Sequence, residues 1–206
     1  YGEFIAADEE GVETGDFGAR DLAVSVGYAY NIPWSDFYVG ANVKFLSSKI
    51  ENFTSQGLAT DIGVYYFSDY RPYSFTAVIR NLGYQITPYE EVREEIAYDI
   101  AIGASFLMSD VPIKWHLTMN SLQQWNLAVP NPSNSKTDLD GNTEEESISF
   151  LDNMMRHVVI GVELFPESKF NLRFGYNFRR AAELKLAEAR TFAGLSAGFG
   201  LKMGRF

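Results

Sequence analysis

The sequence predicts an all-β protein, a transmembrane antiparallel up-and-down β-barrel. Hydrophobicity alternates residue by residue along many segments, most of them about ten residues or longer, and one face is rich in glycine, alanine, serine and ionisable groups. A period of two is typical of β-strands. From Phe170 to Phe178, bulky apolar residues take every second position, with arginine, asparagine and glycine between them. Such a polar face is a poor hydrophobic core, but it suits the wet interior of a barrel whose other face meets lipid.

Ten segments carry the strand pattern. They span residues 1–8, 20–31, 37–52, 57–67, 73–84, 97–107, 112–121, 155–165, 170–179 and 192–204. In 20–31, 57–67, 97–107 and 192–204 the bulky positions oppose small or ionic ones, and in 112–121 they oppose basic and polar ones. We expect the bulky face, represented by Leu22, Ile62, Ile102 and Phe174, to point outward into lipid.

The connections between these segments alternate in length. Short turns fall at 33–35, 68–72, 109–112 and 166–169, each with turn-forming residues. Longer connections fall at 52–56 (the shortest of them), 84–96, 122–154 and 180–191. Outer-membrane barrels have short periplasmic turns and long external loops. The alternation therefore predicts that all long loops lie on one rim.

Two of the long loops carry helical signals. The loop 122–154 begins rich in Asn, Pro and Ser, becomes acidic at 144–146, and then places Ile148, Leu151, Met154 and Met155 at helical spacing. One or two helical turns are expected there, across the barrel mouth, and a second short helix over 181–190.

A soluble β-sandwich or lipocalin-like barrel with the bulky residues inside is the alternative fold. A solvent-exposed strand face rich in Gly, Ala and Ser is unfavourable, because these residues have low strand propensity. Strands of soluble proteins are also commonly only about five or six residues long, shorter than most of the segments here. Packing of Leu22, Ile62, Ile102 and Phe174 against one another in a closed centre would favour this alternative.

Composition restricts the function. The chain has 206 residues, enough for a single barrel domain over 1–206, and a formal net charge of −10, which argues against nucleic acid as a partner. It has no cysteine, so no thiolate metal site or cysteine nucleophile is available. No stretch approaches the roughly 18 consecutive apolar residues of a spanning helix, but a membrane strand needs only about 9–11 residues.

Ionisable residues recur on the small-residue face, which the barrel prediction makes the lumen. They could form a polar conduit or a network of mutually paired charges, and their mixed signs favour pairing. The residues are Asp21, Lys44, Asp61, Arg80, Asp99, Lys114, His116, Glu163, Arg173, Arg179 and Lys202.

Catalytic and metal signals are weak. The two histidines are His116 and His157, and a triad would need one of them beside a serine or aspartate such as Ser149 or Asp152. His157 is better explained as a rim residue where a loop enters a strand. The run Asp138-Leu-Asp-Gly-Asn142 departs from the calcium-loop pattern, whose glycine stands at the sixth position. We therefore expect no enzyme activity, no metal and no cofactor.

Partner recognition is expected in the long loops, because loops on a rigid scaffold commonly carry it. Their aromatic and basic residues could meet acidic partners or lipid phosphates. The candidates are Tyr84, Tyr89, Trp125, Arg179, Arg180 and Lys185.

Several stretches along most of the chain resemble the PorQ family of the Bacteroidetes type IX secretion system, in the PorV/PorQ group of FadL-like outer-membrane barrels. They are residues 2–11 (GEFIAADEEG), 15–22 (GDFGARDL), 48–52 (SKIEN), 57–63 (GLATDIG), 80–84 (RNLGY), 155–163 (MRHVVIGVE), 171–180 (NLRFGYNFRR) and 183–186 (ELKL). The resemblance implies a complete barrel of about fourteen strands, an even number as usual for such proteins, with further segments beyond both ends.

The resemblance also implies a function. Members of the family are not thought to translocate cargo. They anchor the surface protein PorZ beside the sortase-like PorU and PorV, where secreted cargo is joined to lipopolysaccharide. The expected location is the outer membrane of a Gram-negative, Bacteroidetes-like bacterium, in contact with lipid or lipopolysaccharide. The alternatives are a FadL-like transporter of hydrophobic small molecules and a membrane hydrolase.

Overall fold

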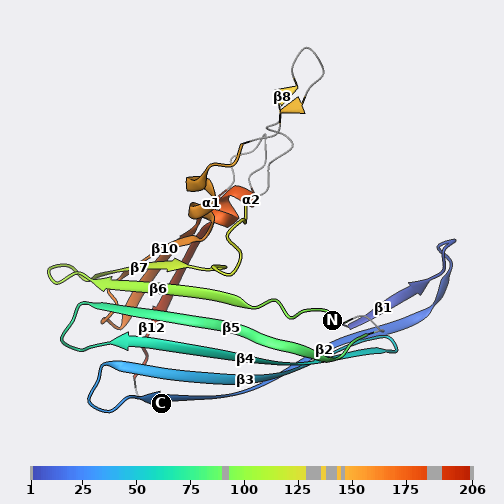
Figure 1. Cartoon of the computed structure of the whole chain (residues 1–206), viewed down its shortest axis with the longest axis horizontal. Helices are drawn as coiled ribbons and strands as arrows, with labels where there is room; N and C mark the ends of the chain where they lie inside the picture. Colours follow the sequence, from blue (N-terminus) through green and yellow to red (C-terminus); the bar gives the residue numbers. More distant parts are fainter. Residues whose placement is uncertain are drawn as a thin grey trace. The chain divides into compact units, whose positions relative to one another are not determined.

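The computed structural model describes residues 2–89, 93–128, 136–137, 143–144, 147–184 and 192–204. It is an all-β structure with one ten-stranded antiparallel sheet, in which neighbours along the chain are neighbours in the sheet (Figure 1). The strands of this sheet are β1 (Gly2–Ala7), β2 (Glu13–Asn31), β3 (Phe37–Ile50), β4 (Phe53–Phe67), β5 (Tyr73–Thr87), β6 (Asp99–Leu107), β7 (Ile113–Met119), β10 (Val158–Leu164), β11 (Phe170–Asn177) and β12 (Leu195–Leu201). All ten predicted strands and their up-and-down order are therefore confirmed.

The sheet is not closed among the described residues, because β1 and β12 stand at the two ends of its order. The chain divides into two compact units. Unit 1 comprises residues 1–64 and 78–99, and unit 2 comprises residues 65–77 and 100–206. The barrel and the single domain over 1–206 remain predictions.

The register keeps the two predicted faces of unit 2 separate. In unit 2, Phe106 pairs with Trp115, Trp115 with Val162, and Val162 with Phe174. On the other face, Ser105 pairs with His116, and His116 with Gly161. A slip of one residue would move every bulky side chain to the small-residue face. The separation of bulky residues from small or ionic residues therefore specifies the register.

The bulky face is exposed. The exposed fractions are 54% for Leu22, 49% for Ile62, 45% for Ile102 and 49% for Phe174. Among the described residues, the buried hydrophobic residues are only Ala59, Ala101, Leu127 and Val158. A closed centre of packed bulky residues, as the soluble alternative requires, is therefore not present in the part of the chain that the structure describes.

Two connections differ from the prediction. The expected long connection at 52–56 is instead a two-residue turn, Glu51 and Asn52, because β4 already begins at Phe53. Glu51 adopts a positive φ of 54°, which suits so tight a hairpin. Strand β2 begins at Glu13 rather than near residue 20, because it continues into a hairpin with β1.

Strands β8 (Lys136–Thr137) and β9 (Thr143–Glu144) form a small separate ribbon. Helix α1 (Phe150–Arg156) confirms the helical turns expected in the same long loop, and it begins with a capping box between Ser149 and Asp152. Helix α2 (Phe178–Glu183) starts earlier than the helix predicted over 181–190, because Asn177 caps it. Residues 185–190 of that prediction lie outside the described residues. No described helix is long and apolar enough to cross a membrane.

Candidate functional site

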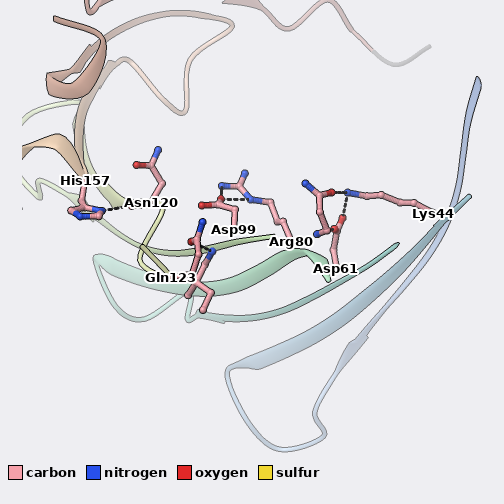
Figure 2. A network of polar contacts seen from close by, with 9 residues as sticks. Lys44, Asp61, Arg80, Asp99, Asn120, Gln123 and His157 are labelled. Atoms are coloured by element: carbon pink, nitrogen blue, oxygen red, sulfur yellow. Dashed lines mark hydrogen bonds and ion pairs between the residues drawn. The ribbon is translucent and has the colours of Figure 1, made fainter. Parts of the chain in front are cut away.

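Charged side chains of unit 1 pair across neighbouring strands. Lys44 of β3 lies 2.6 Å from a carboxylate oxygen of Asp61 on β4 (Figure 2). Nε of Arg80 on β5 donates to a carboxylate oxygen of Asp99 on β6 at 3.1 Å (Figure 2). The exposed Asp21 accepts a hydrogen bond from the hydroxyl of Ser48. Each of these charges thus has a polar partner on its own face of the sheet.

A break in the alternation of β5 is built around Asn81, whose φ is 57°. Its backbone N–H donates to Asp61 at 2.9 Å, and its side-chain oxygen accepts from Lys44 at 2.9 Å. After this residue the polar positions of β5 become odd-numbered, so Gln85 donates to the hydroxyl of Ser55 on β4. The Lys44–Asp61 pair therefore stabilises an irregular strand as well as neutralising charge.

We expect Asp61→Ala to destabilise unit 1 by about 1–3 kcal/mol, because it leaves the Lys44 ammonium without its counterion and the Asn81 N–H without its acceptor. Asp21→Ala is the matched control, since Asp21 is exposed. Its loss should cost under about 1 kcal/mol. Urea titration of both variants measures the difference, and equal midpoints would contradict this account.

A cavity of about 370 Å³ opens beside this network in unit 1. Its lining includes the apolar residues Leu22, Leu46 and Ile96. The Glu94 N–H donates to Gln85 at 2.7 Å and helps to hold the connection to β6 over β4 and β5. Gly57 leaves room for Ile96, because a Cβ at Gly57 would lie 3.1 Å from the Ile96 side chain.

The charges of unit 2 gather around Glu163 of β10. Nε of Arg173 on β11 donates to Glu163 at 3.1 Å, and Nε2 of His116 on β7 lies 3.7 Å from the same carboxylate. Lys114 stands opposite Glu163 in the register of β7 and β10. Lys202 donates instead to the carbonyl of Pro166 at 3.3 Å. The predicted charge network is thus partly paired, and its position in a lumen remains a prediction.

The segment 120–128 is braced against α1 by polar side chains that are buried. Asn153 accepts from the N–H groups of Leu127 and Ala128 at 3.0 and 3.1 Å, and donates to the Trp125 carbonyl at 2.6 Å. His157 has an exposed fraction of 0%, and its ring nitrogens lie 2.8 and 3.1 Å from the carbonyls of Asn120 and Trp125 (Figure 2). His157 stands at the junction of α1 and β10 as expected, but it is buried.

Segment 120–128 and helix α1 together carry apolar side chains that are exposed to solvent. The Trp125 ring stacks on His157 at 5.1 Å and contacts Phe150 at 5.4 Å. Trp125, Phe150 and Leu151 remain exposed. We call these three residues the loop patch. Of these three residues, the sequence pattern had indicated only Trp125 as a candidate partner contact.

The other predicted loop candidates belong to different units of the chain. Tyr84 is exposed and Tyr89 is half-buried, and both belong to unit 1. Arg179 pairs with Glu183 at 2.7 Å within α2, and Arg180 is exposed. Lys185 lies outside the described residues.

The geometry does not assemble a triad. Ser149 caps α1, accepting from the N–H groups of Leu151 and Asp152, and Asp152 accepts from the Ser149 N–H. Both ring nitrogens of His157 face backbone carbonyls instead. No group of three His, Asp or Glu in the described ranges could hold a metal ion, and the run 138–142 lies outside them.

Comparison with known proteins adds no relative. No family model, no curated protein and no solved structure matches the chain.

Proposed function

We propose that this protein is a PorQ-like outer-membrane β-barrel of the type IX secretion system. In this proposal it anchors a PorZ-type surface protein near PorU- and PorV-type components, where secreted cargo is joined to lipopolysaccharide. It acts by position rather than by catalysis. The strands fix it in the outer membrane, and the long loops hold the partner at the surface.

The exposed apolar face of the strands is the observation that carries the proposal. Its rows of Leu, Ile, Val, Phe, Tyr and Trp are exposed on strand after strand, and an extended exposed apolar surface marks a contact with lipid or a partner. The opposite face pairs its charges across strands, as a wet interior permits. Bilayer lipid is the occupant that fits a face repeated on strand after strand.

The loop patch is our choice for the partner contact. Aromatic residues on a rigid support are favoured at interface centres. Trp125, Phe150 and Leu151 have this support, because Asn153 and His157 hold the underlying backbone. A partner that covers the patch buries apolar surface, and little conformational entropy is lost because the loop backbone is already ordered.

Chemical cross-linking in cells, followed by purification from detergent-solubilised outer membrane and mass spectrometry, tests this function. We expect a PorZ-type protein to be recovered, and a double Phe150→Ala, Leu151→Ala variant to reduce its recovery several-fold. Val111→Ala, in the turn between β6 and β7, is the control and should leave recovery unchanged. Recovery of the wild-type protein without any surface partner would contradict the anchoring role.

A FadL-like transporter of hydrophobic small molecules is the second candidate. The irregular strand at Asn81 and the partly apolar cavity beside it favour this function, because both would accommodate a guest within unit 1. Fatty-acid uptake into vesicles that contain the protein would support transport, and uptake equal to that of empty vesicles would exclude it.

A further inference from the structure

A second cavity, of about 220 Å³, opens on the small-residue face of unit 2. Five hydroxyl-bearing and two basic residues contribute to its lining, and none of the described lining residues is acidic. The residues that matter most are Ser74 of β5, Ser105 of β6, and Lys114, His116 and Thr118 of β7. Its chemistry is therefore that of hydrogen-bond donors around positive charge.

The sheet register brings these donors together. Lys114, His116 and Thr118 share one face of β7 by alternation, and His116 stands opposite Ser105. Gly103, opposite Thr118, keeps the space open, because a Cβ there would lie only 2.9 Å from the Thr76 methyl. The pocket is thus a direct result of the small-residue pattern of β6.

The hydroxyls retain donor capacity. The Ser74 and Ser105 hydroxyl oxygens lie 2.7 Å apart, so one of them donates to the other. The hydroxyl that accepts in this pair keeps its own hydrogen for a further acceptor. Ser74 is buried. An oxygen atom of a bound ligand could accept the hydrogen of whichever serine hydroxyl is the acceptor in the Ser74–Ser105 pair.

The local charge is positive. Among the described residues, no carboxylate lies within ion-pair distance of the Lys114 ammonium, although Glu163 stands opposite it in the register. Glu163 is instead engaged by Arg173 at 3.1 Å and lies 3.7 Å from His116. With His116 neutral, Lys114, Glu163 and Arg173 sum to +1. A half-buried ammonium without a counterion favours the uptake of an anion.

We propose that this pocket binds a tetrahedral oxyanion of the phosphate class, with Lys114 as its main cationic contact. Ser105, Ser74 and Thr118 supply neutral donors, and the volume leaves room for the anion with several waters, each of which needs about 30 Å³. Lysine ammonium groups and hydroxyls commonly bind phosphate oxygens. The inference rests on the geometry of unit 2 and does not depend on the proposed function.

Isothermal titration of the detergent-solubilised protein with inorganic phosphate, at constant ionic strength, tests this site. We expect saturable binding that Lys114→Gln weakens about tenfold or more, the usual effect of losing a charge-assisted contact. Lys114→Arg should retain most of the affinity because it keeps the charge. Lys202→Gln is the matched control, since Lys202 donates to a backbone carbonyl elsewhere, and it should bind as the wild type does.

A soluble short-chain phosphatidic acid distinguishes the two sources of the phosphate group. Tighter binding of this lipid than of inorganic phosphate indicates a lipid headgroup, and weaker binding indicates a free anion. Far-UV circular dichroism verifies that each variant is folded. Absence of saturable phosphate and phosphatidate binding to the wild type, or equal affinities in folded Lys114→Gln and Lys202→Gln, would overturn the proposal.

Discussion

Replacing Ile102 with arginine is expected to prevent stable insertion of the protein into a bilayer. Ile102 lies in β6 on the bulky face, opposite Met119 of β7. An arginine on the lipid face of a barrel costs about 2–4 kcal/mol near the bilayer midplane. Folding into phospholipid vesicles, followed by the heat-dependent mobility of the folded form on a gel, measures the loss.

Val111→Arg is the matched control for this substitution. Val111 is 39% exposed, close to the 45% of Ile102, but it lies in the turn between β6 and β7. The account predicts normal insertion of this variant. If the two arginines had the same effect, lipid contact of the bulky face would be disproved.

Asn153→Ala is expected to release segment 120–128 from α1. The substitution leaves the N–H groups of Leu127 and Ala128 without their acceptor and removes the donor to the Trp125 carbonyl. Each polar group left unsatisfied in a buried place costs about 1–3 kcal/mol. Hydrogen exchange at Leu127 and Ala128 should accelerate roughly a hundredfold, which corresponds to about 2.7 kcal/mol.

Asn126→Ala is the control for the bracing, because it removes only the contact of 3.3 Å between the two asparagine side chains. We expect this change to accelerate exchange less than tenfold. In the proposed function, Asn153→Ala should also weaken recovery of the surface partner, since the loop patch loses its support. Unchanged exchange at Leu127 would show that Asn153 does not hold the segment.

The strands could be predicted because two independent signals agree. Alternation sets which residues share a face, and the register then pairs bulky with bulky and small with small residues, as with Trp115 between Phe106 and Val162. Turn-forming residues at 68–72 and 166–169 marked the ends of the strands on either side, which are β4 and β5 for the first turn and β10 and β11 for the second. The alternation in the sequence matches the faces of the folded strands, because a one-residue slip in register would place arginine on the apolar face.

The irregular strand at Asn81 was not predicted, although the sequence carries a signal for it. The polar positions of 73–84 are even-numbered up to Arg80, whereas the polar residue beyond, Gln85, is odd-numbered. A residue with positive φ absorbs that change, and asparagine tolerates it better than most residues. The acceptor that stabilises it, Asp61, lies on another strand and is not visible in local sequence.

The bracing of the loop could not be predicted from local pattern. Helical spacing in 148–155 predicted helical turns but not which side chains of the helix and its C-terminal cap are buried. Those include Asn153 and His157, while Leu151 is exposed. Their partners lie 25 or more positions away, at Asn120, Trp125 and Leu127. Polar burial of this kind depends on long-range hydrogen bonds, which a periodicity analysis does not detect.

Quenching of tryptophan fluorescence by lipids brominated in their acyl chains tests the central claim most directly. The chain has three tryptophans, so a variant with Trp34→Phe and Trp125→Phe reports on Trp115 alone. Trp115 is 46% exposed and lies between Phe106 and Val162 on the bulky face. The account predicts strong quenching by the brominated lipids and little quenching by aqueous acrylamide. The reverse result would contradict it.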